Sequence, residues 1–297
     1  MGAAIGVIAS EKIAVGLVDG HRIVGEVVTS EELMSLPAEA IAPMIYRLIA
    51  QVCREASVEP GHLEAVGIGF PGIVRDGIVQ DSPNLQQVKG LNLRESLRNV
   101  LAAHHADVPV LVVNDADAMA AGIAATLGHL EKVIRVWTLG NGIGFGRYPQ
   151  SDGAYEGGHS VISLDPKETY CGCGGVGHLE GIMGHRAMRL RFLDMEPDEI
   201  FEEAKGGDKR CCDFVRLWHR ALAAATATHI HIDGPGKFFL SGPNADYADV
   251  TQLSQLLHEM VKLTPLQGSV FEVISTSREI AIIGAALDAL LVYPPPK

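Results

Sequence analysis

A short glycine-rich segment in the middle of the chain restricts the possible fold more than any other stretch. Glu156-Gly157-Gly158-His159 is followed by Cys171-Gly172-Cys173-Gly174-Gly175-Val176-Gly177-His178-Leu179-Glu180, so cysteines, histidines and carboxylates gather in one place. Thiolate sulfur and imidazole nitrogen are ligands that tetrahedral zinc prefers, and glycine lets the backbone turn tightly around a small ion. The competing interpretation is a surface loop with chance cysteines, but the ligand spacing and a reducing compartment favour zinc. We predict a Zn2+ site on His159, Cys171, Cys173 and His178, with His185 as the competitor for the fourth position.

Composition and charge indicate a two-domain cytoplasmic protein. A chain of 297 residues is long enough for two separate cores, and 47% hydrophobic residues with 33 glycines suit an α/β protein with many tight turns. The net charge of −12 argues against nucleic acid or an anionic membrane as a partner. No apolar run reaches the length of a membrane span, the N-terminus lacks the basic region of a secretory signal, and the five cysteines do not read as a disulfide framework.

Local patterns predict strands and helices along the whole chain. The opening segment, residues 4–28, reads as three strands, because Ala9-Ser10-Glu11-Lys12 and Asp19-Gly20 separate its apolar runs. Apolar spacings of three and four predict helices, and β-branched runs predict buried strands. Further strands are expected at 63–74, 108–113, 133–139, 237–240 and 270–275, and helices at 37–56, 93–105, 116–126, 196–204, 209–229, 249–263 and 279–292. His229 and His231 lie on an alanine-rich surface and are expected to be solvated or capped.

Two strand ends carry residues that suit a functional site. The strand 108–113 ends in Asn114-Asp115, and a helix follows at once. Functional residues of open α/β sheets gather at such ends, although an aspartate there is about as often a simple helix cap. The strand 133–139 runs into Gly140-Asn141-Gly142-Ile143-Gly144-Phe145-Gly146, a layout that echoes the opening hairpin. A plain glycine hairpin is the alternative for this second turn.

Together these motifs resemble the ROK family of sugar kinases and sugar-responsive repressors. The segment 156–180 is similar to the family's zinc signature, with His178 in place of a third cysteine. Imidazole is an ordinary zinc ligand, so this replacement keeps four ligands. Gly67-Ile68-Gly69-Phe70-Pro71-Gly72 followed by Ser82-Pro83-Asn84-Leu85, the Asn114-Asp115 junction and the glycine turn 140–146 also match the family pattern. The resemblance spans essentially the whole chain.

The resemblance implies a two-domain actin-like (ribonuclease H-like) sugar kinase fold of the α/β class, with an interdomain cleft. The expected small N-terminal α/β domain comprises residues 1–117 plus 284–297. The expected larger C-terminal α/β domain comprises residues 118–283 and carries the zinc loop.

The same resemblance implies ATP-dependent phosphorylation of a hexose, as in a glucokinase, by a homodimer. Asp115 is the implied general base. The residues implied to hold sugar hydroxyls are Asn84, Asn114, Glu156, His159 and Glu180. The residues implied to bind ATP with Mg2+ are Lys12, Gly140, Asn141, Gly142, Gly144 and Gly242. The zinc of the family is structural and fixes the loop that presents the sugar contacts.

The first phosphate loop departs from the family pattern. The family sequence D-x-G-G-T-K aligns with Val7-Ile8-Ala9-Ser10-Glu11-Lys12, so Val7 replaces the aspartate that organises Mg2+. The loss of both glycines hinders close approach of the backbone to a phosphate, and Glu11 adds like-charge repulsion. We therefore expect weak ATP binding and low kinase activity. The alternatives are a sugar-binding protein that has lost phosphoryl transfer and a kinase that uses a different phosphoryl donor.

Overall fold

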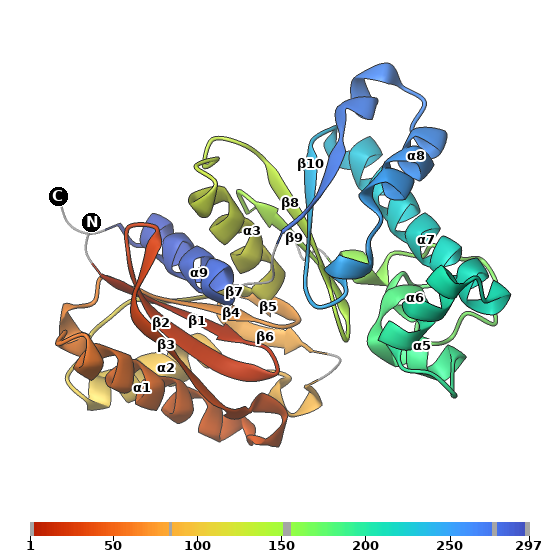
Figure 1. Cartoon of the computed structure of the whole chain (residues 1–297). Helices are drawn as coiled ribbons and strands as arrows, with labels where there is room; N and C mark the ends of the chain where they lie inside the picture. Colours follow the sequence, from red (N-terminus) through yellow and green to blue (C-terminus); the bar gives the residue numbers. More distant parts are fainter. Residues whose placement is uncertain (1–2, 83–84, 151–155, 275–277, 295–297) are drawn as a thin grey trace. The chain divides into compact units, whose positions relative to one another are not determined.

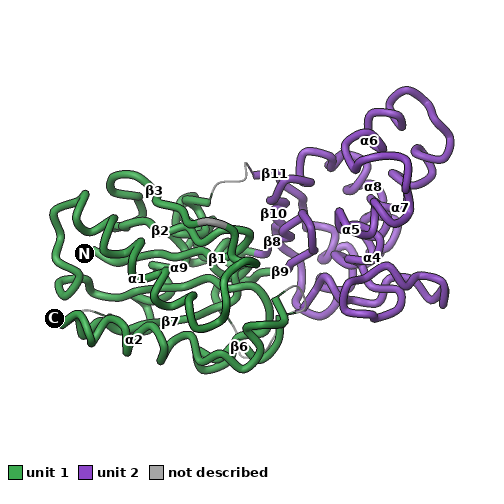
Figure 2. Tube along the Cα trace, turned by 90° about the horizontal axis from the view of Figure 1, so that it is seen from below, with its two compact units in different colours: residues 1–134, 146–154, 277–297 green, residues 135–145, 155–276 purple. Residues whose placement is uncertain are grey.

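The computed structural model describes residues 3–82, 85–150, 156–274 and 278–294, and the chain divides into two compact units (Figure 2). Unit 1 comprises residues 1–134, 146–154 and 277–297, and unit 2 comprises residues 135–145 and 155–276. These limits differ from the expected boundaries at 117/118 and 283/284. The difference arises because the helix that begins at Asp115 packs against the C-terminal helix, inside unit 1.

Unit 1 is built on a five-stranded sheet with the strand order β3-β2-β1-β4-β7. Strands β1 to β3 form an antiparallel meander, and β4 and β7 continue the sheet parallel to β1. The strands are β1 (Ala4–Ala9), β2 (Lys12–Asp19), β3 (Arg22–Glu32), β4 (Val66–Phe70) and β7 (Val110–Asn114). A separate hairpin is formed by β5 (Ile73–Arg75) and β6 (Ile78–Asp81).

Four helices cover the two faces of this sheet (Figure 1). The helices α1 (Ala38–Glu55) and α2 (Leu93–Ala103) cover one face, and α3 (Asp115–Thr126) and α9 (Arg278–Val292) cover the other. The apolar stripe of α1 packs into the core of the first face, as its three-and-four spacing predicts. Helix α9 lies directly on β4, and glycine at position 67 allows this close contact. A Cβ atom there would be only 1.8 Å from the Ala285 carbonyl oxygen.

Unit 2 is built on a four-stranded sheet with the order β11-β10-β8-β9, in which β10 pairs in parallel with β8 and β11. The strands of this sheet are β8 (Ile134–Leu139), β9 (Ile143–Tyr148), β10 (Lys237–Ser241) and β11 (Val270–Val273). The first residue of β8 and the last three of β9 are assigned to unit 1. The helices of unit 2 are α4 (Glu180–Met183), α5 (His185–Arg191), α6 (Pro197–Gly206), α7 (Lys209–Asp233) and α8 (Val250–Met260). Aromatic side chains from the sheet and from α7, including Trp137, Trp218 and Phe238, fill its core.

The expected strands and helices are present near their predicted ends, with one difference. The expected strand 63–74 is divided into β4 and β5, because Gly72 adopts a φ of +96° and turns the chain. The expectation for His229 is wrong, since only 12% of its side chain is exposed and its ring stacks on Phe145 at 3.9 Å. Within the described ranges, the helices are too short or too polar to cross a membrane.

Candidate functional site

The predicted metal ligands come from two loops of unit 2. His159 ends a short 3-10 turn, Gly157–His159, and the cysteines lie on the loop that leads into α4. Gly158 packs against β9 so closely that a Cβ atom would lie 1.8 Å from the Ile143 carbonyl oxygen. Only glycine fits at this contact, and the turn thereby holds His159 at a fixed distance from the sheet.

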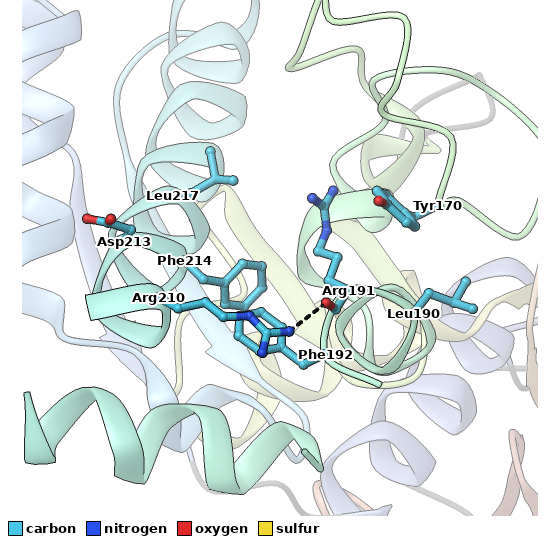
Figure 3. Close-up of a pocket in the computed structure, with 8 residues that line it drawn as sticks. All are labelled: Tyr170, Leu190, Arg191, Phe192, Arg210, Asp213, Phe214 and Leu217. Atoms are coloured by element: carbon cyan, nitrogen blue, oxygen red, sulfur yellow. Dashed lines mark hydrogen bonds between the residues drawn. The ribbon is translucent and has the colours of Figure 1, made fainter. Parts of the chain in front are cut away.

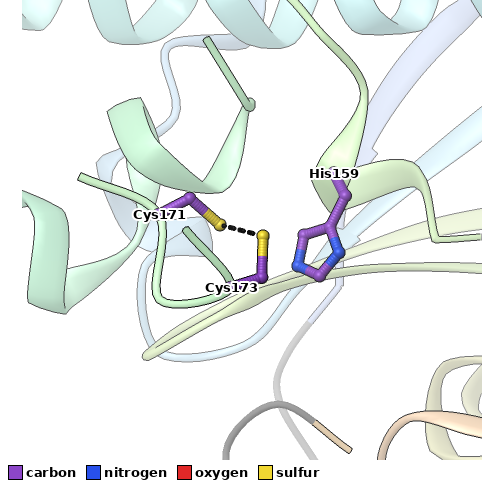
Figure 4. Close-up of side chains that lie close together, drawn as sticks. All are labelled: His159, Cys171 and Cys173. Atoms are coloured by element: carbon purple, nitrogen blue, oxygen red, sulfur yellow. Dashed lines mark hydrogen bonds between the residues drawn. The ribbon is translucent and has the colours of Figure 1, made fainter. Parts of the chain in front are cut away.

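The ligand atoms of His159, Cys171 and Cys173 lie within 4.8 Å of one another (Figure 4). The two sulfur atoms are 3.3 Å apart, and Nδ1 of His178 lies 3.3 Å from the Cys173 sulfur. The four predicted ligands are therefore gathered in one place. His185, the competitor for the fourth position, instead uses its ring Nε2 to donate a hydrogen bond to Oδ1 of Asn244.

The electrostatics of this cluster favour a cation. Hydrogen bonding to Cys171, followed by that to Glu180, raises the pKa of His159 to about 11. Burial and the neighbouring His159 lower the pKa of His178, which keeps this imidazole neutral and able to donate its lone pair. Two thiols, two imidazoles and a nearby carboxylate match the donor chemistry of a zinc site, so the residues present fit this metal.

Glu180 connects the cluster to the glycine turn between β8 and β9. Its Oε2 accepts a hydrogen bond from the Ile143 N–H at 2.9 Å, and its Oε1 lies 3.5 Å from the Cys171 sulfur and 3.9 Å from Nε2 of His159. Burial opposes its ionisation, but the contacts with His159 and the Ile143 N–H outweigh burial and hold the pKa of Glu180 below its usual value. The carboxylate is therefore fixed and charged.

The glycine turn and the turn after β10 lie side by side. Gly140 donates its N–H to the Gly142 carbonyl at 3.1 Å, and Asn141 is exposed at the tip. Gly242 has a φ of +99° and lies against Leu139, which places the turn after β10 next to the residue that precedes the glycine turn. Four of the residues expected to bind ATP, Gly140, Asn141, Gly142 and Gly242, thus belong to one neighbourhood, while Gly144 lies within β9.

In unit 1, Asn114 and Asp115 stand where β7 ends and α3 begins. Asn114 is the helix cap: its Oδ1 accepts from the Ala116 N–H at 2.8 Å, and its Nδ2 donates to the Gly72 carbonyl at 2.9 Å. Asp115 is the first residue of the helix, and burial raises the pKa of its carboxyl to about 6. Asn114 therefore caps the helix, and the half-buried carboxylate of Asp115 accepts from the same Ala116 N–H, through Oδ1 at 3.0 Å.

The other predicted residues are placed as follows. Val7 lies inside β1 and is fully buried in the core of unit 1, whereas Glu11 and Lys12 are exposed at the turn between β1 and β2. A metal ligand at position 7 would have to replace a core side chain. Asn84 lies outside the described residues.

A pocket of about 410 Å³ in unit 2 contains none of these residues (Figure 3). It is lined by Tyr170, Leu190, Arg191, Phe192, Arg210, Asp213, Phe214 and Leu217. Its two arginines already carry charge partners, since Arg191 pairs with Glu168 and Arg210 pairs with Asp194. Asp213, the other charged residue of the lining, pairs with Arg216, so the pocket offers no uncompensated charge to a ligand.

Sequence reasoning missed the pair formed by His185 and Asn244. Asn244 lies two residues after Gly242, which was expected to bind ATP, but no local pattern distinguishes its side chain from that of an ordinary turn asparagine. The contact joins residues 59 positions apart, and only the folded chain brings them together.

Comparisons with known proteins identify the family of this chain. The model of the ROK family matches residues 5–290. A glucokinase of Pyrobaculum calidifontis is 29% identical over 266 residues, which cover 84% of this chain and 86% of that protein.

Solved structures share the fold. A ROK hexokinase of Thermus thermophilus is 26% identical with a TM-score of 0.78, and the match covers 98% of each chain. A ROK family glucokinase of Streptomyces griseus, solved in complex with glucose and AMPPNP, is 24% identical with a TM-score of 0.74 and covers 98% of this chain and 100% of that one. The fold is thus that of the actin-like sugar kinases.

Proposed function

Because this chain belongs to the ROK family, we propose that it is a sugar kinase that transfers a phosphoryl group from ATP to a hexose, as a glucokinase does. The observation that carries the proposal is the carboxyl of Asp115 at the carboxyl end of β7, with its pKa raised by burial to about 6. A carboxylate with a pKa close to the working pH is suited to accept a proton in a general-base step.

In the proposed reaction, Asp115 accepts the proton of the sugar hydroxyl as this hydroxyl attacks the terminal phosphate. Asn84, Asn114, Glu156, His159 and Glu180 hold the other hydroxyls of the ring. Asn114 remains able to do so, because a primary amide has two donor hydrogens and two acceptor lone pairs, and the bonds to the Ala116 N–H and the Gly72 carbonyl use one of each.

The proposed nucleotide contacts are the N–H groups and side chain of the turn Gly140–Gly142, together with Gly144, Gly242 and Lys12. Mg2+ bound with ATP would neutralise phosphate charge. Position 7 contributes no ligand for this ion, because Val7 is an apolar, fully buried residue.

We propose that the metal cluster binds a structural Zn2+ through His159, Cys171, Cys173 and His178. The ion would hold together the two segments that carry Glu156, His159 and Glu180, the proposed sugar contacts of this unit. The convergence of the ligand atoms supports this assignment. The zinc content of protein purified without chelator, measured by elemental analysis, tests it.

The general-base assignment is tested with Asp115→Asn. The amide keeps the size of the carboxylate but cannot take the proton, so ADP release with glucose should be lost while calorimetric glucose binding stays within a few-fold. Asp19→Asn, at the exposed end of β2, is the matched control and should behave as the unmodified protein. Turnover retained in Asp115→Asn would reduce Asp115 to a structural residue.

A second candidate function is sugar binding without phosphoryl transfer. The observation that favours it is the first phosphate turn, where Val7 is buried and Glu11 is exposed. The same assay, run with ATP and with polyphosphate over glucose, mannose and N-acetylated sugars, separates the candidates. Sugar binding without turnover with either donor would favour the binding protein, and turnover with polyphosphate alone would identify a different donor.

We also propose that the protein acts in the cytoplasm as a homodimer. Leu164 and Leu193 of unit 2 are almost fully exposed, and large exposed apolar side chains favour a protein interface. Sedimentation of the purified chain tests this assembly.

A further inference from the structure

Asn244 is a buried amide that the proposed reaction does not use. Its exposed fraction is 0%, and it lies directly after the turn that follows β10. Its backbone N–H donates to the Leu139 carbonyl at 3.0 Å, which attaches it to the end of β8. Burying an amide is costly unless its polar atoms are hydrogen-bonded, so the partners of this side chain indicate what the residue does.

Both ends of the Asn244 amide are hydrogen-bonded. Its Oδ1 accepts from ring Nε2 of His185, and its Nδ2 donates to the Gly140 carbonyl at 3.3 Å. The backbone N–H of His185 donates to the same Gly140 carbonyl at 3.2 Å. These three hydrogen bonds close a ring that joins the start of α5, the turn after β10 and the first residue of the glycine turn. A buried network with its polar groups satisfied fixes one geometry.

The other end of the glycine turn is also held by a side chain. Glu180 accepts the Ile143 N–H at 2.9 Å, immediately after Gly142. At the tip, a Cβ atom at Gly184 would lie 2.8 Å from the Asn141 carbonyl oxygen, so the start of α5 lies close along the turn. A segment with two glycines in three residues has high conformational freedom, and these contacts at both ends remove it before any ligand binds.

We propose that Asn244 and His185 are a positioning pair that presets the turn Gly140–Gly142 for the phosphates of the nucleotide, and so determine nucleotide affinity. This inference rests on the proposed function, in which the turn contacts ATP. The first phosphate turn carries Ser10 and Glu11 where the family has glycine and threonine, so the second turn supplies a larger share of the binding. Its preorganisation therefore matters more in this chain.

The test is Asn244→Asp. Aspartate keeps the acceptor for His185 but replaces the donor to the Gly140 carbonyl with an oxygen, so the bond to the turn becomes a repulsive contact. We expect the Kd of AMPPNP and the KM of ATP to rise about tenfold, as the loss of one buried hydrogen bond predicts, with kcat and the Kd of glucose unchanged within error. Asn92→Asp is the matched control, because aspartate also caps α2.

His185 provides the second arm of the experiment. His185→Gln can still donate to Asn244 and should retain most of the nucleotide affinity, whereas His185→Phe should weaken it as Asn244→Asp does. A purely structural role would lower the affinities for glucose and nucleotide together, and that result would overturn the proposal. Unchanged nucleotide affinity in both Asn244→Asp and His185→Phe would overturn it as well.

Amide hydrogen exchange separates this inference from the proposed function. If the unmodified protein binds no AMPPNP, the proposed kinase function has failed. The exchange of the Gly140 and Ile143 amides then still decides whether the pair orders the turn. Faster exchange at these amides in Asn244→Asp than in Asn92→Asp supports the positioning role, and equal exchange refutes it.

Discussion

The contact between α3 and α9 gives a sharp prediction for Gly284. A methyl group at this position would lie 1.8 Å from the Ala118 carbonyl oxygen and 2.4 Å from the Gly122 nitrogen. Both are backbone atoms within α3, so neither can rotate aside. Gly284→Ala must therefore push the two helices apart rather than displace a side chain.

The magnitude follows from the size of this overlap. Carbon and oxygen in ordinary contact are about 3.4 Å apart, so the helices must separate by about 1.5 Å, enough to remove more than half of the dispersion energy of the neighbouring contacts. Helix α9 cannot tilt to compensate, because Gly67 seats it equally closely on β4. Overpacking typically costs about 1–3 kcal/mol, and we expect about 3 kcal/mol here. Alanine favours a helix over glycine by about 1 kcal/mol, so strain exceeds propensity.

The assay is thermal unfolding followed by circular dichroism, with Gly206→Ala as the matched control. We expect Gly284→Ala to lower the melting temperature by about 6–12 °C. Gly206 lies in the last turn of α6 with no atom within 4 Å of an added Cβ, so alanine there should stabilise the protein by about 0.5–1 kcal/mol. A Gly284→Ala protein that melts at or above the temperature of the unmodified chain would refute the packing of α9 on α3.

Four further predictions concern charge and metal. The kcat/KM for phosphoryl transfer should fall about tenfold between pH 7 and pH 5, because burial raises the pKa of Asp115 to about 6 and the base must be ionised. Initial rates that do not change over this pH range would contradict the role of Asp115 as general base. Asp288→Asn should stabilise the protein by about 1–3 kcal/mol near pH 8 in chemical denaturation, because Asp288 is 7% exposed and its Oδ2 has no hydrogen-bond partner among the described residues. Burial, followed by the charge of Asp117, raises the pKa of Asp288 above the value of about 4 that an aspartate has in the unfolded chain. The folded state therefore loses stability as the pH rises above about 4, and the extra stability of Asp288→Asn should vanish below about pH 4. Val7→Asp should lower the melting temperature, more at pH 8 than at pH 5, since it places a carboxylate in the core; an unchanged melting temperature would show that position 7 is open to solvent. Cys171→Ser should reduce bound zinc and glucose affinity together, and loss of zinc with unchanged glucose affinity would separate the metal from the sugar loop.

Much of the architecture was predictable because the signals that determine it are local. The spacing of apolar residues in α1 and the β-branched run of β7 set their secondary structure wherever these segments pack. The gathering of the four proposed zinc ligands was also predictable, because three of them lie within one loop of eight residues, 171–178, where short loop closure brings them together. The order of strands in the two sheets and the limits of the two units could not be predicted in this way, because they depend on contacts between distant segments.

The helices and strands, the family resemblance and the gathering of His159, Cys171, Cys173 and His178 follow from local patterns, because each depends largely on residues close together in the chain. No local pattern shows that Val7 is a core residue, that His229 stacks on Phe145, or that Asn244 joins His185 to the glycine turn. Each of these facts depends on partners from distant segments, and the burial that makes a polar group costly or an apolar group favourable exists only after those segments have packed.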